Sequence, residues 1–198
     1  MEISAALVRE LRDKTNAGMM DCKQALQQTG GDMNKAIDLL RQKGLATAMK
    51  RAGKEASEGT VHAYIHGGGR MGVLVEVNCE TDFAGKSPDF LEFVKNIAMQ
   101  IAAANPLGIT KEDVPPEVIE RERAIYLAQA QESGKPANIL EKMVDGKLRK
   151  FYQEVVLLEQ AYVKDPEKTI QDYLNELIAK TGEKVMIRRF VRFQLGVE

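Results

Sequence analysis

Residues 73–83 read VLVEVNCETDF, and this stretch decides the fold because a strand pattern ends abruptly in it, at charged and aromatic residues. Small apolar side chains occupy every second position from Val73 to Cys79 and alternate with larger or polar ones. This alternation is typical of a strand with one buried face. The chain then leaves the predicted sheet at Thr81.

Asp82 and Phe83 follow directly at the strand exit. A carboxylate is not buried without a partner, and turn geometry does not require an aromatic ring. The pair therefore indicates a surface wedge, in which the ring enters an apolar cleft of another molecule and the charge acts beside it. The alternative is that Phe83 covers the chain's own core.

A second strand pattern precedes the first, because Val61, Ala63 and Ile65 alternate with polar and aromatic neighbours. Residues 67–72, GGGRMG, join the two strands as a hairpin loop. The loop matches the G-x-G-x-x-G dinucleotide fingerprint only formally, since that motif must open a helix and this loop leads into a strand. Residues 184–195 form a third strand pattern.

Three short helices are expected over the first 45 residues. Ser4 and Asp32 are the predicted N-caps of the first and third helices, and the pair Gly30-Gly31 ends the second. Gly44 is expected to end the third helix. Residues 46–58 are rich in Ala, Lys, Gly and Ser and predict a linker, with a short helix inside it as the alternative.

Met19 and Met20 follow Gly18 in the break between the first two helices, outside the clear inward positions. Methionine is flexible and polarizable, which suits an adaptable contact surface. The alternative is that one of the two fills the small core of the three helices.

Four more helices are expected later in the chain, with the last strand pattern after them, so the fold class is α+β. One of them carries an apolar stripe at spacings of three and four, as in a coiled coil, formed by Leu140, Val144, Leu148, Phe151, Val155 and Leu158. A short turn at Gly134-Lys135-Pro136 precedes it and predicts an antiparallel helical hairpin over about residues 116–160. The stripe packs either on the body of the protein or on a partner.

The composition excludes several classes of protein. With 44% hydrophobic and 29% charged residues among 198, the chain is typical of a soluble globular protein. The formal net charge of -1 gives no electrostatic case for direct nucleic-acid binding. No apolar run reaches the roughly 18 residues of a membrane helix, and no export signal opens the chain, so a cytoplasmic location is expected.

Catalytic and metal chemistry lack a convergent motif. Cys22 and Cys79 match no paired metal or redox spacing. His62 and His66 lie roughly 13 Å apart along one predicted strand, too far to share a metal ion. No catalytic, cofactor or metal site is assigned, although an enzyme that uses these cysteines or histidines stays open as an alternative.

Three segments, read together, carry a family resemblance. They are residues 11–26 (LRDKTNAGMMDCKQAL), 76–83 (EVNCETDF) and 157–166 (LLEQAYVKDP). In this order they resemble the translation elongation factor Ts family, and the resemblance covers essentially the whole chain. Members of this family are not enzymes but nucleotide-exchange factors, which bind the GTPase elongation factor Tu and promote the release of GDP during translation elongation.

The resemblance implies an N-terminal three-helix, ubiquitin-associated-like domain with its linker at residues 1–55. It implies a core domain at residues 56–198, in which a small antiparallel sheet packs with helices and carries the helical hairpin. The chain is similar to short members of the family, with one sheet unit where longer members carry two. A homodimer that supplies the second unit, giving a 2:2 complex, is compatible with this length.

The resemblance also assigns partner contacts. Asp82 and Phe83 match the pair that inserts near the GTPase's magnesium and phosphate site. The surface that docks on the GTP-binding domain is matched by Arg12, Met19, Met20 and Lys23. Tyr162 and Val163 match the segment that touches the third domain of the GTPase. A competing hypothesis is an adaptor that recognises ubiquitin-like proteins through Gly18-Met19-Met20.

Overall fold

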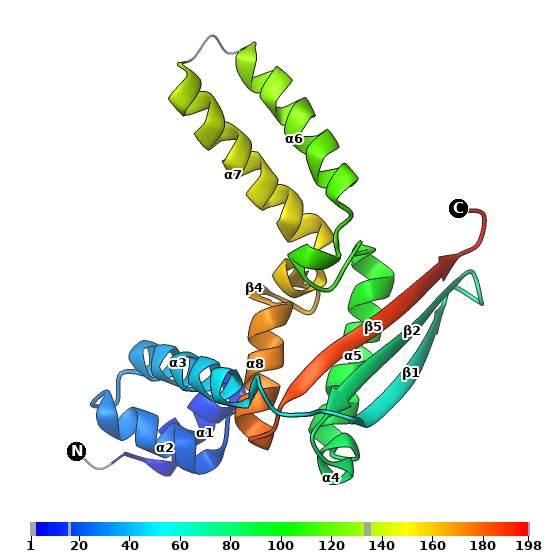
Figure 1. The fold of residues 1–198 in the computed structure, drawn as a ribbon. Coiled ribbons are helices and arrows are strands. Elements are labelled where there is room, and N and C mark those ends of the chain that lie inside the picture. The colour runs from blue at the N-terminus through cyan, green and yellow to red at the C-terminus, as the bar shows by residue number, and fades with distance from the viewer. Residues whose placement is uncertain (1–2, 16, 133–135, 198) are drawn as a thin grey trace. The chain divides into compact units, whose positions relative to one another are not determined.

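The computed structural model of the chain describes residues 3–15, 17–132 and 136–197. Residue 16, in the predicted break after the first helix, and residues 134–135 of the predicted hairpin turn lie outside these ranges. Figure 1 shows helices together with a small sheet, which confirms the predicted α+β class.

The helices are α1 (Ala5–Thr15), α2 (Met19–Gln28), α3 (Met33–Arg51), α4 (Asp82–Gly85), α5 (Pro88–Ala104), α6 (Pro116–Gln131), α7 (Ala137–Val155) and α8 (Ile170–Thr181), with 3-10 turns η1 (Lys111–Asp113) and η2 (Leu157–Glu159). The strands are β1 (Glu58–His66), β2 (Met71–Cys79), β3 (Ala161–Tyr162), β4 (Asp165–Thr169) and β5 (Val185–Gln194). The chain divides into two compact units. The first takes the residues up to 63, 74–97 and 172–191, and the second takes the rest.

Three helices open the first unit, as predicted. The Ser4 hydroxyl accepts the Leu7 N–H (3.3 Å) and the Asp32 carboxylate accepts the Lys35 N–H (3.0 Å), so both predicted N-caps are confirmed. An apolar core lies between the three helices. Its buried members are Val8, Leu11, Cys22, Ala25, Leu26 and Ala36.

Helix α3 is longer than predicted. Gly44 lies inside it, and residues 46–51 of the expected linker continue the helix to Arg51. A β carbon at Gly44 would lie 3.5 Å from the Asn175 carbonyl oxygen and 3.6 Å from the Ala179 β carbon, both on α8. The predicted helix end was wrong because this glycine allows two helices to approach closely, and in sequence that looks the same as a C-cap.

The sheet has the strand order β1-β2-β5, and β1 and β2 form the predicted hairpin through a loop with positive φ at residues 67–69. One face of β2 is buried through Val75, Val77 and Cys79. Helix α5 lies along the sheet (Figure 1), and its phenylalanines are fully buried. The predicted small antiparallel sheet packed with helices is therefore confirmed.

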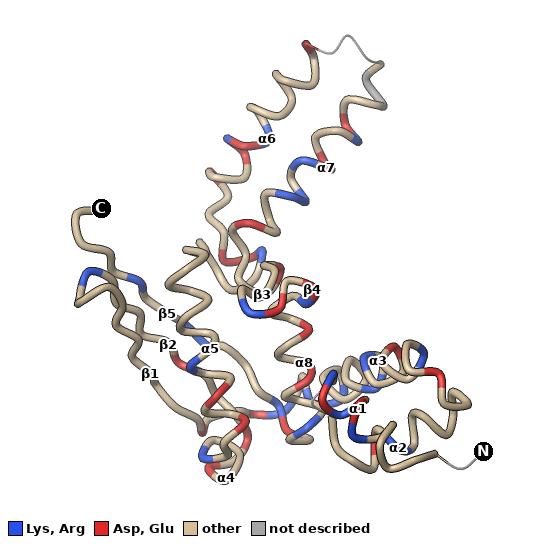
Figure 2. The backbone as a smooth tube through the Cα atoms, turned by 180° about the vertical axis from the view of Figure 1, so that it is seen from behind, with Lys and Arg blue, Asp and Glu red and all other residues tan. Residues whose placement is uncertain are grey.

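In the second unit, α6 and α7 lie side by side as an antiparallel pair in both Figure 1 and Figure 2. Ala130 of α6 is buried together with Val144 and Leu148 of α7, and Tyr126 and Leu140 pack around them. The first three members of the predicted stripe, Leu140, Val144 and Leu148, thus pack within the hairpin itself.

Positive and negative residues are interspersed along the backbone (Figure 2), which agrees with the near-zero net charge. Within the described ranges, no helix combines the length and the apolar character needed to cross a bilayer.

We expect Gly44→Leu to lower the free energy of unfolding by about 1–3 kcal/mol, because a leucine does not fit between α3 and α8. Gly44→Ala should be neutral or stabilising by up to about 1 kcal/mol, since its new contacts would be of ordinary length and alanine favours a helix. Urea unfolding followed by circular dichroism measures both variants.

Gly146 on α7 is the matched control, because nothing lies within 4 Å of its β-carbon position. Gly146→Leu should therefore leave stability unreduced. An equal loss in both leucine variants would contradict the close approach of α3 and α8.

Candidate functional site

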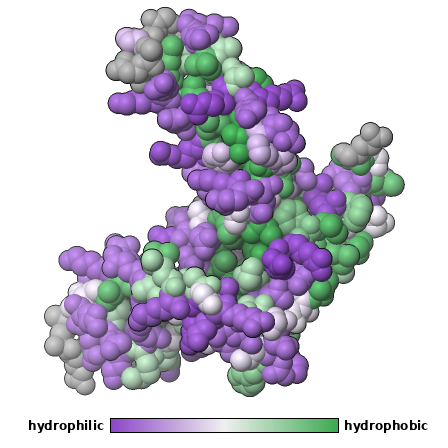
Figure 3. Space-filling model, in the orientation of Figure 1, coloured by the Kyte–Doolittle hydropathy of each residue, from purple (hydrophilic) through white to green (hydrophobic). Residues whose placement is uncertain are grey.

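Phe83 lies on a short helix at the exit of β2. Helix α4 begins at Asp82, and its N-cap is Thr81, whose hydroxyl accepts the Ala84 N–H (3.2 Å). The ring of Phe83 is 83% exposed, and Figure 3 shows apolar surface protruding at the position of α4. The alternative that this ring covers the chain's own core is therefore wrong, and the ring is available to another molecule.

The inner side of α4 rests on the sheet. Ala84 and Gly85 are buried, and a β carbon at Gly85 would lie 3.3 Å from the Cys79 Sγ and 3.4 Å from the Gly59 Cα. The Cys79 thiol also donates to the carbonyl of Thr81 (3.1 Å). The helix is thus packed on one side and presents its aromatic ring on the other.

Charged residues tie the exit of β2 to the end of α3 and the start of β5. Glu80 accepts the backbone N–H of Lys184 (2.6 Å) and pairs with the Arg51 guanidinium (3.2 Å). The Lys184 ammonium donates to the carbonyl oxygens of Ala52 and Lys54, both at 2.8 Å. Charge-assisted bonds of this kind hold their partners in a defined geometry. The base of α4 and the end of the three-helix region therefore share one hydrogen-bond network.

Asp82 is exposed and pairs with Lys86 one helical turn further on (2.8 Å). The hydrogen bond from Lys86, followed by its positive charge, lowers the pKa of Asp82, and the same contact raises the pKa of Lys86. Asp82 is therefore ionised at neutral pH.

The predicted contact residues of the first two helices are all accessible. Met19 and Met20 are the first two residues of α2. The prediction that they lie in the break before this helix was therefore wrong. Met20 is 75% exposed and Met19 is 42% exposed, so neither fills the small core. Arg12 on α1 and Lys23 on α2 are also exposed.

Val163 lies at the tip of a hairpin between β3 and β4, an element that the sequence pattern did not reveal. Tyr162 pairs with Asp165 across the hairpin, which leaves Val163 and Lys164 as its two-residue loop. Val163 is 45% exposed, whereas Tyr162 is 6% exposed. The structure presents one member of the predicted pair and buries the other, so a direct contact between Tyr162 and a partner is not expected.

Gln100, a fully buried residue of α5, holds this hairpin in place. Its amide oxygen accepts the Val163 N–H (2.9 Å), and its amide nitrogen donates to the Gln160 side chain (3.1 Å) and the Ala161 carbonyl (3.2 Å). A buried amide is stable only when its polar atoms are paired, as they are here. A lone glutamine among the apolar positions of α5 is the sequence signal that could have located this support.

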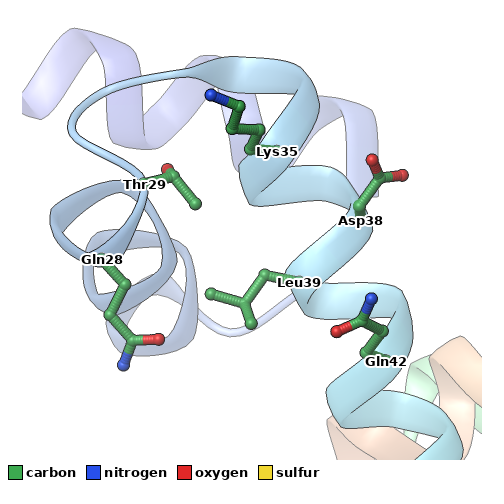
Figure 4. A pocket seen from close by; sticks show the side chains of 6 residues that line it. All are labelled: Gln28, Thr29, Lys35, Asp38, Leu39 and Gln42. Atoms are coloured by element: carbon green, nitrogen blue, oxygen red, sulfur yellow. The ribbon is translucent and has the colours of Figure 1, made fainter.

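A shallow hollow of about 340 Å³ lies between the end of α2 and α3 (Figure 4). Its lining residues are Gln28, Thr29, Lys35, Asp38, Leu39 and Gln42. The side chain of Leu39 points into the space between the two helices. The hollow lies at the opposite end of α2 from Met19 and Met20, so it is not part of the predicted contact surface.

Neither cysteine offers a reactive thiolate. Both are buried, and burial raises the pKa of Cys22 and raises the pKa of Cys79 to about 11, where the negative charge of Glu183 adds to the effect. The thiols therefore offer no nucleophile at neutral pH. In the part of the chain that the structure describes, no three potential metal ligands come together.

Comparisons with known proteins agree with one another. Residues 5–197 match the family model described as elongation factor TS. A protein named elongation factor Ts from Syntrophobacter fumaroxidans is 76% identical over 198 residues, covering 100% of this chain and 99% of its own length. Two proteins of the same name, from Caldanaerobacter subterraneus subsp. tengcongensis and Desulfosudis oleivorans, are 63% and 62% identical over 194 residues; each match covers 98% of this chain, and 97% and 98% of the relatives' own lengths.

Replacing Lys86 by glutamine should raise the pKa of Asp82 toward the ordinary carboxyl value of about 3.9, because a hydrogen bond and a positive charge are lost. Since the pKa of Asp82 is lower in the folded than in the unfolded chain, the Asp82–Lys86 pair stabilises the protein at neutral pH. That contribution is lost as the pH falls through the folded pKa in the acid range. NMR titration of the Asp82 carboxyl carbon measures the shift. Lys95→Gln, on exposed α5 surface, is the control and should leave this pKa unchanged; an unchanged pKa in Lys86→Gln would show that the pair does not form in solution.

Proposed function

The chain belongs to the elongation factor Ts family, and on this basis we propose that it is a guanine nucleotide exchange factor for the GTPase elongation factor Tu. In this role it binds the GTPase and promotes the release of GDP during translation elongation. The name of its relatives supports the activity. The exposed ring of Phe83, on a helix packed against its own sheet, is the observation that carries the mechanism.

Exchange requires no covalent chemistry from this chain. If the GTPase holds GDP at nanomolar strength, binding of about -12 kcal/mol must be offset. Linkage requires that GDP weaken the binding of the factor by the same ratio as the factor weakens the binding of GDP. The factor must therefore bind best to a GTPase conformation whose phosphate and magnesium ligands are displaced.

Phe83 inserts near that magnesium and phosphate site and holds its elements apart, while the ionised Asp82 disturbs the metal and its water ligands. The packing of α4 supports this role, because Ala84 and Gly85 anchor the helix to the sheet before any partner is present. A preorganised ring loses little conformational freedom on binding, so more of the contact energy is left to distort the partner.

The remaining predicted residues supply affinity. Arg12, Met19, Met20 and Lys23 bind the GTP-binding domain, and the exposed methionines suit this role because they adapt to an apolar surface. Val163 contacts the third domain. Tyr162, being buried, supports the hairpin beneath Val163 and does not itself touch the GTPase.

The same proposal makes the chain a cytoplasmic, non-enzymatic factor that needs no cofactor and binds neither nucleic acid nor a membrane directly. Its domains are residues 1–55, the ubiquitin-associated-like part, and residues 56–198. The rival adaptor for ubiquitin-like proteins would use the same exposed methionines. A pull-down that compares a ubiquitin-like protein with the GTPase separates the two.

The proposed assembly is a homodimer of this chain that binds two GTPase molecules. The outer face of the sheet supports it, because Val61, Leu74 and Val191 are exposed on three adjacent strands. Figure 3 shows apolar surface over β1. Exposed apolar surface of this kind marks an interface.

Phe83→Ala should slow catalysed GDP release by at least about tenfold, because it removes the group that holds the nucleotide site open, while the chain stays folded. Stopped-flow fluorescence with a labelled GDP bound to the GTPase measures the rate. Leu127→Ala, which removes another exposed apolar side chain, on α6, should leave the rate unchanged. Wild-type rates in Phe83→Ala would reject the wedge.

Val191→Glu should convert the proposed dimer to a monomer, because a charge on the apolar outer face of the sheet opposes the burial of that face. Light scattering after size-exclusion chromatography measures the mass. Met49→Glu places the same charge at an exposed site on α3 and should not change the mass. A monomeric wild-type chain at micromolar concentration would contradict the homodimer.

A further inference from the structure

We propose that Glu183 is a positioning residue for the exchange reaction, holding α4 so that Phe83 is presented in one orientation. This inference rests on the proposed role of Phe83 in opening the nucleotide site. Glu183 lies in the connection between α8 and β5, and 102 residues separate it from its partner in sequence.

The Glu183 carboxylate holds Thr81 at two points. One oxygen accepts the backbone N–H of Thr81 (3.0 Å), and the other accepts its hydroxyl proton (2.7 Å). A carboxylate can accept one such bond on each of its two oxygens, and charge-assisted bonds are stronger than neutral ones. Thr81 is therefore fixed in both its backbone and its side chain.

The hydroxyl of Thr81 links this contact to the ring. A threonine hydroxyl has one proton and two lone pairs. Because Glu183 takes the proton, a lone pair is left for the Ala84 N–H, which it accepts at 3.2 Å as the N-cap bond of α4. Glu183 thus selects the hydroxyl orientation that caps the helix carrying Phe83.

One further hydrogen bond fixes the position of Glu183 itself. Glu80 accepts the backbone N–H of Lys184, the next residue, at 2.6 Å. Each of two adjacent chain segments therefore uses a glutamate side chain to bind a backbone N–H of the other: Glu80 to Lys184, and Glu183 to Thr81. This reciprocal arrangement continues the connection between β2 and β5 beyond the end of β2.

The need for such support follows from the length of α4. A helix of four residues has too few internal hydrogen bonds to be stable alone. Ala84 and Gly85 pack on the sheet, and the exposed first turn is held by its N-cap, by the backbone bond from the Gly85 N–H to the Thr81 carbonyl (3.2 Å) and by the Asp82–Lys86 pair. Without Glu183, the first turn is free to fray, and Phe83 samples orientations that do not fit the partner.

The test compares Glu183→Ala and Glu183→Gln with the wild-type chain in GDP release from the GTPase. We expect the maximal rate at saturating factor to fall roughly three- to tenfold in Glu183→Ala, the range typical of a lost helix cap, with little change in the half-saturating concentration. Glu183→Gln keeps one acceptor oxygen, so its maximal rate of GDP release should lie between the rates of wild type and Glu183→Ala. Glu92→Gln, exposed on α5, removes the same charge and should behave as wild type.

A double-mutant cycle separates positioning from general stability. If Glu183 acts through the ring, Phe83→Ala and the double variant Phe83→Ala/Glu183→Ala release GDP at the same rate. The inference would be overturned if the double variant released GDP more slowly than Phe83→Ala by the same factor that Glu183→Ala loses relative to wild type. Equal maximal rates in Glu183→Ala and wild type would do the same.

Amide hydrogen exchange tests the positioning without the GTPase. The Ala84 and Gly85 amides should exchange several-fold faster in Glu183→Ala than in wild type, while the amides of α1 and α2 stay unchanged. Unchanged exchange at Ala84 and Gly85 would overturn the inference even if Phe83→Ala slows GDP release. A Phe83→Ala variant with normal activity, beside faster amide exchange in Glu183→Ala, would instead reject the wedge and leave the support of α4 standing.

Discussion

Burial of one face of β2 is the constraint on which the presentation of the aromatic ring depends. Val75, Val77 and Cys79 are almost completely buried, and a slip of one residue would turn this whole set toward solvent. The strand therefore cannot shift, and the point at which the chain leaves the sheet is fixed. Because α4 starts at that point and is only four residues long, the ring is placed by the sheet and by the residues that bind its N-cap. The orientation of the exposed Phe83 ring therefore depends on the buried side chains of β2.

In the proposed function, this arrangement separates two tasks of an exchange factor. In the proposed complex, affinity comes from broad accessible surfaces such as Met19 and Met20, where flexible side chains adapt to a partner. Distortion of the nucleotide site requires a group that does not adapt, since a ring that moves aside transmits no strain. The chain therefore places flexible residues at the first kind of contact and a packed, capped helix at the second. By linkage, the energy for the distortion must come from the affinity contacts.

Much of the fold follows from local sequence signals, and the failures have physical causes. The caps at Ser4 and Asp32 and the hairpin loop act between residues that are close in sequence, so they can be read directly. Gly44 was misread because one residue type serves both to end helices and to let them approach. The candidate site residues Asp82 and Phe83 could be named from their pattern, but the support of α4 could not. Glu183 comes to Thr81 only through the fold, and no local pattern marks a loop glutamate as a ligand for a distant N–H group.

The central claim is that the ring enters the nucleotide site of the GTPase, and fluorine NMR at one position tests it most directly. 4-Fluorophenylalanine at position 83 should give a solvent-like resonance in the free chain. On addition of nucleotide-free GTPase the resonance should move to a buried environment, and excess GDP should return it to the starting position. A resonance that does not respond to the GTPase, or that stays buried when GDP is bound, would contradict the account.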